Sequence, residues 1–247
     1  MMGITRMLVL FWALWAGGLQ AGSVRYQVEG RTFEGYHLAG ASQQSTLVLL
    51  IHDWDGLTGY EMKRADMLAA LGYRVFAADL FGVGLRPTAV EDKKRLTGAL
   101  YQDRASMRTL LAGALVEATR LGGKPKKVVA LGYCFGGAAV LELARSEADL
   151  HGTVSVHGGL ETPPGQNYQQ VRGRVLIQHG SADEAVSLGQ FAALIGELER
   201  AGISHEATSY SGAPHAFSVF GSDRYHAEAD ALAWQRLVGF LAEISAK

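Results

Sequence analysis

The one cysteine of the chain, Cys134, lies among glycines in the segment 132–137, which reads GYCFGG. An apolar run, 127–131, precedes this segment and an Ala- and Leu-rich run, 138–144, follows it, which predicts a strand, a tight turn and a helix. The pattern is G-x-S-x-G with Cys in place of Ser, and it is typical of a strained turn that raises a nucleophile above a sheet. A helix N-terminus behind the thiol favours an anion and so stabilises a thiolate. We therefore interpret Cys134 as a nucleophile rather than a small buried hydrophobic residue.

A thiol nucleophile needs a base that takes its proton and a group that orients the base. In folds with this turn, an acid and then a histidine follow the nucleophile along the chain. Asp183 and His215 each follow a predicted strand, and the carboxyl ends of parallel strands meet at one edge of a sheet. We predict that Cys134 attacks, His215 moves the proton and Asp183 orients the imidazole. Glu184 is an alternative to Asp183, which could instead cap the helix that follows.

Three further histidines, His52, His157 and His179, also end predicted strands. None lies in the last loop between a strand and a helix, so we interpret them as residues behind the reacting groups or in the walls of the site rather than as the base. With Asp53 they raise the alternative of a metal centre, but their positions lack a short ligand spacing such as H-x-x-x-H. We therefore expect neither a metal nor a cofactor.

An oxyanion that forms during attack by Cys134 needs two backbone N–H donors. One is expected from the residue after the nucleophile, Phe135, and the other from the loop 52–56 that follows the first buried strand. Gly56 allows this loop to fold tightly, and Trp54 is expected to form a wall of the pocket.

Strands alternate with helices along the whole chain, which predicts an α/β fold with a mostly parallel sheet covered by helices on both faces. The two segments 23–28 and 32–38 alternate in polarity and predict an N-terminal antiparallel hairpin. Residues 80–100 are interpreted as a surface excursion with a short helix. Further strands are expected at 46–51, 73–78, 127–131, 152–156, 174–178 and 206–210, and further helices at about 59–71, 102–121, 187–201 and 226–244.

Residues 1–21 have one basic residue followed by a short apolar run and the small residue Ala21, a pattern typical of a signal peptide. We predict cleavage before Gly22, a single domain over 22–247 and a periplasmic or secreted bacterial protein; an uncleaved anchor is the alternative. The formal net charge of −1 does not indicate a basic surface that would bind nucleic acid or an anionic membrane. The lone cysteine of an exported chain has no internal partner for a disulfide.

With these motifs in place, the chain resembles the dienelactone hydrolase family over roughly residues 24–245. The resemblance rests on the GYCFGG turn, on Asp79-Leu80-Phe81, on the segments HGSAD at 179–183 and APHAF at 213–217, and on Tyr225 and Trp234 near the last helix. It implies a cofactor-free α/β-hydrolase that acts on small-molecule esters or lactones through a thioester intermediate.

The resemblance also implies roles for the loop after the first buried strand. Family members carry there a glutamate that pairs with the resting thiol, and Asp53 occupies that position with one methylene fewer. A carboxylate beside Cys134 would disfavour the thiolate until substrate displaces it. Trp54 then matches the second oxyanion donor.

The chain departs from the family where substrate binds. The dienelactone enzyme grips a substrate carboxylate with arginines, one of them four residues past the catalytic histidine, where this chain has Val219. Arg95 falls near the position of another such arginine. Because a bidentate arginine recognises a carboxylate strongly, we expect dienelactone to be a poor substrate and a less charged ester to be preferred, with Trp54, Phe217 and Val219 as apolar lining.

Other functions use the same residues. An acyltransferase would pass the thioester to an acceptor other than water, and nothing in the sequence separates it from a hydrolase. A non-catalytic binding protein is disfavoured by the complete set of Cys134, Asp183 and His215. A thiol redox protein is disfavoured because the chain has no second cysteine.

Overall fold

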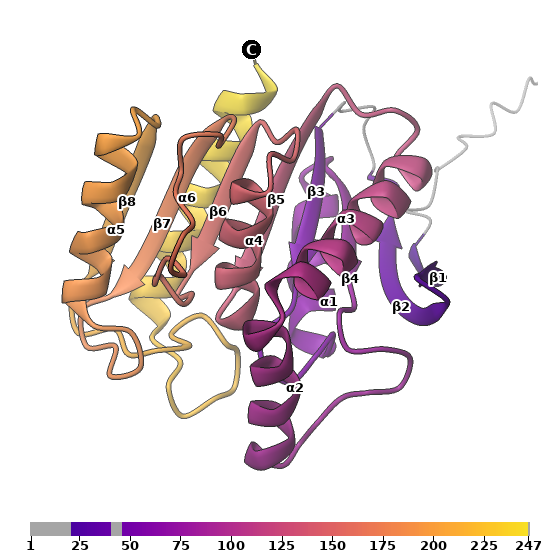
Figure 1. The fold of residues 1–247 in the computed structure, drawn as a ribbon, viewed down its shortest axis with the longest axis horizontal. Helices are drawn as coiled ribbons and strands as arrows, with labels where there is room; N and C mark the ends of the chain where they lie inside the picture. The colour runs from indigo at the N-terminus through magenta and orange to yellow at the C-terminus, as the bar shows by residue number, and fades with distance from the viewer. Residues whose placement is uncertain (1–20, 41–45, 247) are drawn as a thin grey trace, which may run out of the picture.

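Strands β3 to β8 run parallel to one another, and an antiparallel hairpin of β1 and β2 extends the sheet beyond β4. The computed structural model describes residues 21–40 and 46–246, and within them the strand order is β1-β2-β4-β3-β5-β6-β7-β8 (Figure 1). The predicted fold class is confirmed. The strands are β1 Ala21–Val28, β2 Arg31–Leu38, β3 Thr46–Ile51, β4 Arg74–Ala78, β5 Lys127–Tyr133, β6 Gly152–Val156, β7 Arg174–Gly180 and β8 His205–Tyr210.

Helices cover both faces of the sheet (Figure 1). The helices are α1 Gly59–Ala70, α2 Val90–Gln102, α3 Arg104–Leu121, α4 Phe135–Arg145, α5 Leu188–Arg200 and α6 Ala227–Ser245. Every residue of β3 is buried, as its continuous apolar sequence predicts. Leu49 packs in the cluster with α3, α4 and α5, whereas Leu50 packs in the opposite cluster with α1 and α6. Successive side chains of β3 therefore pack against helices on opposite faces of the sheet.

The segment predicted as a surface excursion differs from the expectation, because its helix is long. Helix α2 covers 13 residues and ends at Gln102, and α3 starts two residues later at Arg104. Asp103 separates the two helices: its backbone leaves the helical region at φ −113° and ψ 81°, and its carboxylate accepts a hydrogen bond from the Ser106 amide. An Asp in this position caps the following helix, so the two predicted helices are present, the first of them longer than expected and the two separated by a single residue.

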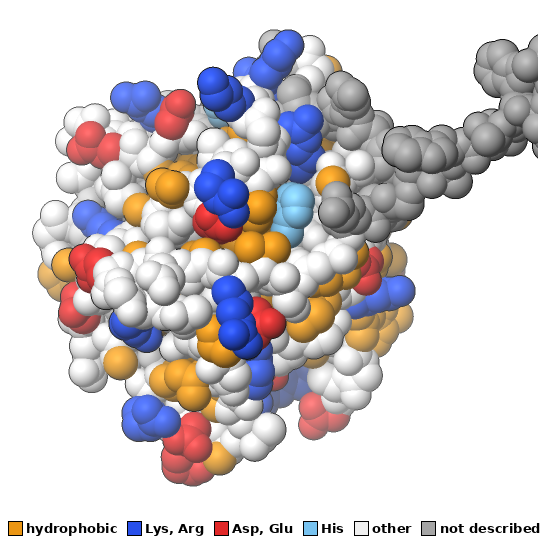
Figure 2. Space-filling model, turned by 90° about the vertical axis from the view of Figure 1, so that its right-hand side faces the viewer, with side chains coloured by type: hydrophobic (Ala, Val, Ile, Leu, Met, Phe, Trp, Pro, Cys, Tyr) orange, Lys and Arg blue, Asp and Glu red, His pale blue; other side chains and the backbone are white. Residues whose placement is uncertain are grey.

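The predicted signal peptide lies mostly outside the described residues, and strand β1 begins at Ala21, beside the expected cleavage point. No helix among residues 21–40 and 46–246 combines the length and apolar character needed to cross a membrane. Figure 2 shows the end of the molecule formed by β1 and β2, where side chains of both charge signs lie among apolar ones. This mixture agrees with the formal net charge of −1.

Candidate active site

The turn between β5 and α4 holds Cys134 in a backbone conformation that is rare for any residue with a side chain, with φ 51° and ψ −114°. Neighbouring glycines make this turn possible. A Cβ on Gly132 would lie 2.0 Å from the Gly136 carbonyl oxygen, and a Cβ on Gly136 would lie 2.2 Å from the Ile51 carbonyl oxygen. The strained conformation is held by its surroundings, as is common for reactive residues.

The structure brings Cys134, His215 and Asp183 into one hydrogen-bonded line. Nε2 of His215 lies 3.1 Å from the Cys134 sulfur, and Nδ1 of His215 lies 2.8 Å from Oδ2 of Asp183. The other carboxylate oxygen of Asp183 accepts hydrogen bonds from the amides of Ala185 and Val186, each at 2.8 Å. The acid is therefore fixed at both oxygens, and it orients the imidazole toward the thiol. The alternative acid, Glu184, is exposed.

The electrostatics of this line favour a positive imidazole. Burial alone would lower the pKa of His215, but its hydrogen bonds to Asp183 and Cys134 and their charges raise the pKa to about 10. Burial would raise the pKa of Asp183, yet the hydrogen bond and charge of His215 and the two loop amides lower it. At neutral pH the acid is ionised and His215 readily holds a proton beside the sulfur.

The two residues predicted to donate to an oxyanion, Phe135 and Trp54, lie beside Cys134. Phe135 is the first residue of α4, where N–H groups have no acceptor within the helix. Trp54 lies in the loop after β3, and both residues line the same pocket as Cys134. Within the described part of the chain, neither amide donates a hydrogen bond to another group.

The pocket above the thiol has a volume of about 460 Å³ and opens to solvent. Its lining comes from the turn and the start of α4, from α2, α3 and α5, and from the loops after β3, β6, β7 and β8. The lining residues are Trp54, Thr97, Tyr101, Arg104, Cys134, Phe135, Ala138, Gly159, Leu160, Glu161, Ala185, Val186, Gln190 and His215.

Three residues expected to bind substrate lie elsewhere. Arg95 is 67% exposed and pairs with Asp92 at 2.8 Å, away from the pocket lining. Phe217 belongs to the loop that carries His215, but its side chain is fully buried in the core against Tyr210, and Val219 does not line the pocket. Helix phase and loop direction, rather than position along the chain, decide which side chains face the thiol. Trp54 is a pocket wall, as predicted.

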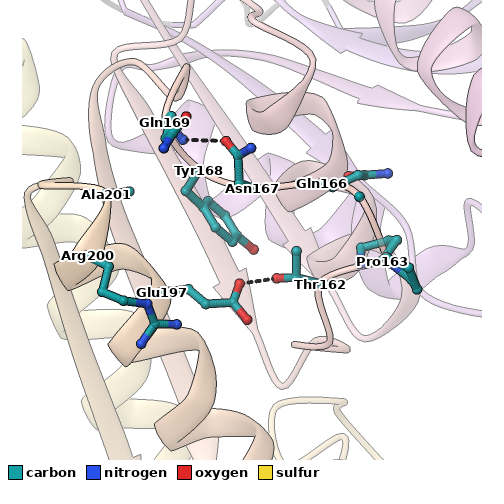
Figure 3. Close-up of a pocket in the computed structure, with 11 residues that line it drawn as sticks. Thr162, Pro163, Gln166, Asn167, Tyr168, Gln169, Glu197, Arg200 and Ala201 are labelled. Carbon is teal, nitrogen blue, oxygen red and sulfur yellow. Dashed lines mark hydrogen bonds between the residues drawn. The ribbon is translucent and has the colours of Figure 1, made fainter.

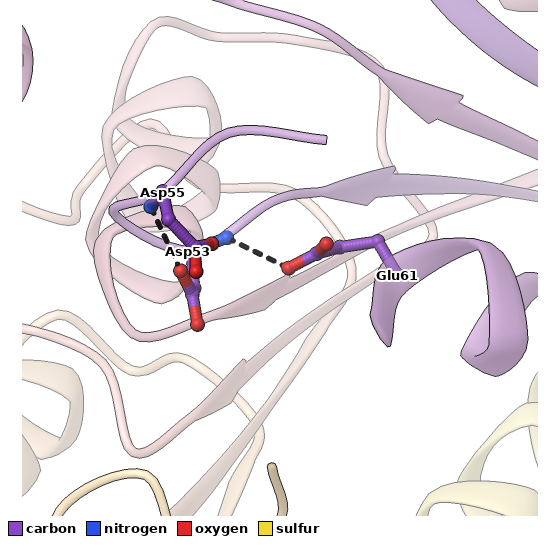
Figure 4. A group of neighbouring side chains, drawn as sticks. All are labelled: Asp53, Asp55 and Glu61. Carbon is purple, nitrogen blue, oxygen red and sulfur yellow. Dashed lines mark hydrogen bonds between the residues drawn. The ribbon is translucent and has the colours of Figure 1, made fainter. Parts of the chain in front are cut away.

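The loop after β3 and the start of α1 hold three carboxyl groups close together, those of Asp53 and Asp55 in the loop and Glu61 in the helix (Figure 4). Oδ1 of Asp53 accepts a hydrogen bond from the Asp55 amide at 3.0 Å, and Oε1 of Glu61 accepts one from the Asp53 amide at 3.2 Å. Burial, with the neighbouring carboxyl groups, raises the pKa of Asp53 to about 10. Asp53 is therefore neutral at pH 7. Among the hydrogen bonds of the described residues, none joins it to Cys134, so the expected gating contact is not made in this structure.

The three histidines at strand ends are buried beside the site. Nε2 of His52 accepts a hydrogen bond from the Leu80 amide at 3.1 Å, Nε2 of His157 lies 2.8 Å from the Ser218 hydroxyl, and His179 stacks on Phe191. None of the three lines the pocket, so they are not its walls; they are buried behind it.

A buried network that the sequence analysis did not identify supports the His215 loop. Arg64 of α1 is 1% exposed; it pairs with Asp230 of α6 and donates to the Ser218 carbonyl oxygen at 2.7 Å. The Tyr60 hydroxyl lies 2.6 Å from the Ser218 hydroxyl. The sequence did contain a signal for this network. Arg64 lies on the apolar face of a predicted helix, and an arginine that is buried there needs a partner.

A second hollow of about 490 Å³ lies between the proline-containing loop after β6 and helix α5 (Figure 3). Two hydrogen bonds join residues of its lining: the Thr162 hydroxyl donates to the Glu197 carboxylate at 2.5 Å, and the Gln169 backbone amide donates to Oδ1 of Asn167 at 3.0 Å. It contains none of Cys134, Asp183 and His215.

Comparison with known proteins agrees with this architecture. The sequence model of the dienelactone hydrolase family matches residues 33–245. A solved structure called m3DLH is 31% identical with a TM-score of 0.82, covering 92% of this chain and 99% of its own. The dienelactone hydrolase-like promiscuous phosphotriesterase P91, from metagenomic libraries, is 29% identical with the same TM-score and the same coverage.

Proteins named for the family's activity are more distant or match over less of their length. A Saccharolobus solfataricus protein, named provisionally as a carboxymethylenebutenolidase, is 32% identical over 120 residues, which span 49% of this chain and 46% of that protein. The mouse carboxymethylenebutenolidase homolog is 22% identical and aligned over 81% of both chains.

Proposed function

The chain belongs to the dienelactone hydrolase family of ester-bond hydrolases, and we propose that it hydrolyses carboxylic esters or lactones through a thioester on Cys134. The observation that supports this proposal most is the unbroken hydrogen-bonded line of Asp183, His215 and Cys134, of which His215 and Cys134 line an open pocket. Such a line supplies a nucleophile, a proton carrier and an orienting acid in one place.

In the proposed acylation, the Cys134 sulfur forms a bond to the ester carbonyl carbon, whose oxygen becomes an oxyanion. The amides of Phe135 and Trp54 donate hydrogen bonds to that oxygen. When the intermediate collapses, the carbon–oxygen bond to the alcohol breaks, and Nε2–H of His215 gives its proton to the departing alkoxide. The product is an alcohol, or in a lactone the hydroxyl end of the same molecule.

In the proposed deacylation, His215 takes a proton from a water molecule that attacks the thioester carbon. The second tetrahedral intermediate collapses with cleavage of the carbon–sulfur bond, which releases the carboxylic acid and returns the thiolate beside the imidazolium. The carboxylate of Asp183 stabilises the charged imidazole in both halves of the reaction. Acyl transfer would differ only in the acceptor that replaces water.

The test uses nitrophenyl esters, small lactones and dienelactone with the wild-type protein and with Cys134→Ala. We expect Cys134→Ala and His215→Ala to lower kcat by at least about 1,000-fold, because the members of such a triad act as a unit. Circular dichroism checks that both variants are folded. Mass spectrometry of the wild type quenched during turnover should show an acyl group on Cys134.

Retained turnover in Cys134→Ala would refute the nucleophile assignment. Product analysis with an added alcohol separates the hydrolase from the acyltransferase, since the acyltransferase would form a new ester in preference to the acid. We further propose that the protein is exported and that residues 1–21 are removed, which would leave Gly22 at the start of β1.

A further inference from the structure

A further hollow borders the imidazole of His215. It has a volume of about 550 Å³, and its walls come from the loops after β7 and β8. Its lining residues are Ala182, Glu184, Ala185, Pro214, His215 and Arg224. Of these, only Ala185 and His215 also line the pocket that contains Cys134. The two spaces therefore adjoin at the imidazole, and we name the second one the imidazole hollow.

The proposed reaction assigns the two parts of an ester to different spaces. The acyl carbon must lie within bonding reach of the Cys134 sulfur and its oxygen near the Phe135 amide, and these two residues line only the thiol pocket. The alcohol oxygen must instead lie near Nε2 of His215, which gives it a proton. The alcohol part therefore leads away from the thiol past the imidazole, toward the imidazole hollow.

The imidazole hollow carries two opposite charges. Glu184 and Arg224 are both exposed, and among residues 21–40 and 46–246 neither side chain forms an ion pair or a hydrogen bond with another residue. A charged alcohol part that is attracted by one of them would be repelled by the other. A hydroxyl group donates to a carboxylate and accepts from a guanidinium, so an uncharged group with several hydroxyls suits both.

The rest of the lining is small and apolar. The side chains of Ala182, Ala185 and Pro214 have no polar atoms, so a short carbon skeleton can pack on them while its hydroxyls reach Glu184 and Arg224. A small lactone joins its acyl and alcohol parts in one ring and has no free alcohol chain to enter this space. Two adjoining spaces therefore fit an open-chain ester better than a lactone.

We propose that the imidazole hollow is the subsite for the alcohol part of the substrate, and that the preferred substrate is an open-chain ester of a small polyol such as glycerol. The proposal rests on the proposed ester hydrolysis at Cys134. The acyl chain occupies the thiol pocket, and the products are the carboxylic acid and the free polyol. An uncharged polyol also agrees with the expectation of a less charged ester.

The experiment compares two esters with the same acyl chain and different alcohols, 1-butyrylglycerol and ethyl butyrate, and adds δ-valerolactone as a cyclic substrate. Titration of the released acid follows all three reactions. Each kcat/KM is divided by the rate constant for hydroxide-catalysed hydrolysis of the same compound, which removes differences in intrinsic reactivity. The quantity of interest is the ratio of this corrected kcat/KM for 1-butyrylglycerol to that for ethyl butyrate, called the glyceryl ratio.

We expect a glyceryl ratio of about ten in the wild type, because hydrogen bonds to two exposed charged groups contribute about threefold each. Glu184→Gln and Arg224→Gln should each lower the ratio by about threefold for the same reason. Ala182→Trp should lower it by about tenfold, since an indole at this exposed position fills the imidazole hollow without lining the thiol pocket. The corrected kcat/KM for δ-valerolactone should be lower than that for 1-butyrylglycerol.

Two matched controls lie outside the imidazole hollow. Ala193→Trp adds the same side chain at an exposed position of α5, and Asp223→Asn removes a charge from the exposed residue before Arg224. Their glyceryl ratios should stay within about twofold of the wild type, as is usual for surface substitutions. The proposal is overturned by a wild-type ratio below about three, or by a ratio that Ala182→Trp and both Gln variants leave unchanged. Faster corrected turnover of δ-valerolactone than of 1-butyrylglycerol would overturn it as well.

A binding measurement separates this proposal from the proposed function. Saturation-transfer NMR with 1-butyrylglycerol is made on Cys134→Ala and on Cys134→Ala combined with Ala182→Trp. Saturation of the glyceryl protons that is lost in the double variant supports the subsite even if no ester is turned over, in which case the proposed function alone fails. Glyceryl protons that stay unsaturated, or are saturated equally in both proteins, would contradict the subsite. Thiol-dependent turnover with a low glyceryl ratio would leave the proposed function in place and overturn the subsite alone.

Discussion

Burial changes what Asp53 does beside the thiol. The family resemblance implies an ionised acid that competes with the base for Cys134, but the low polarity around Asp53 and the nearby carboxyl groups raise its pKa to about 10. The thiol instead contacts Nε2 of His215 at 3.1 Å. The free protein therefore holds its nucleophile and base already paired.

Replacing Asp53 with Asn should leave thiol reactivity nearly unchanged at neutral pH. A neutral carboxyl exerts no net charge on the sulfur, and Asn keeps the oxygen that accepts from the Asp55 amide. We expect the rate of Cys134 alkylation by iodoacetamide at pH 7, followed by mass spectrometry, to stay within about twofold of the wild type. His215→Gln is the control and should slow alkylation. Alkylation that is faster by about tenfold or more in Asp53→Asn would show that an ionised Asp53 restrains the thiol.

For single residues, the sequence predicted which side chains carry the chemistry better than it predicted which side chains face the pocket. Cys134, Asp183 and His215 follow strands, so the sheet itself brings them to one edge. Arg95 and Arg104 lie in adjacent helices, and only packing decides which of them faces the pocket. Helical spacing in the sequence does not predict which of the two faces the pocket. The chain leaves the helical conformation at Asp103, so the spacing of residues before it does not give the direction of side chains after it.

The loop between β8 and α6 carries His215, and residues other than Cys134 and Asp183 hold this loop in place. Ser218 of this loop is 1% exposed. Its hydroxyl lies 2.6 Å from the Tyr60 hydroxyl and 2.8 Å from Nε2 of His157, while its carbonyl oxygen accepts from Arg64. Helix α1 and the loop after β6 thereby fix the loop that must present the imidazole.

Ser218→Ala should lower kcat by about tenfold while KM stays within about twofold. The change removes two buried hydrogen bonds and loosens the position of His215, and small displacements of a catalytic group reduce the rate more than binding. Steady-state kinetics on a nitrophenyl ester measure this split. Ser222→Ala in the same loop is the matched control, since the Ser222 hydroxyl accepts from the Arg224 amide near the surface and contacts none of these residues. Equal kcat in wild type and Ser218→Ala would limit Ser218 to a role in stability.

The order of the elements was predictable because apolar runs and helical spacing repeat along the chain. The boundaries were less so. Residues 90–102 are polar and strongly charged, and they form a full helix because Thr97 and Leu100 find buried positions against neighbouring elements. Tertiary packing supplies that stabilisation, and it is invisible in local composition.

For the whole molecule, the site lowers the free energy of unfolding because the fold buries carboxyl groups away from water. Glu61 of α1 is fully buried, and its oxygens accept from the amides of Asp53 and Thr58. Burial raises the pKa of Glu61 to about 7, against the hydrogen bonds from these amides, which lower it. The native protein thus keeps a proton on Glu61 at pH values where the unfolded chain, with an ordinary glutamate pKa near 4.5, has released it.

This difference sets the sign of a pH effect on stability. Between about pH 4.5 and pH 7 the native state binds more protons at Glu61 than the unfolded state does, so the free energy of unfolding falls as the pH rises through this window. The contribution is complete below about pH 4.5 and lost above about pH 7. With about 1.4 kcal/mol for each pKa unit, the change amounts to about 3 kcal/mol.

Glu61→Gln should remove this part of the pH dependence. Glutamine keeps an oxygen for the loop amides and does not ionise, so the free energy of unfolding of the wild type minus that of the variant should fall by about 3 kcal/mol from pH 4 to pH 8. Urea denaturation at several pH values measures the difference. Glu91→Gln, at an exposed position of α2, is the control and should run parallel to the wild type over this range. Parallel curves for Glu61→Gln as well would mean that Glu61 has the same pKa in the native and the unfolded protein. The loop after β3 would then be held by a charged acceptor at neutral pH, and of the two groups only Asp53 would carry a proton there.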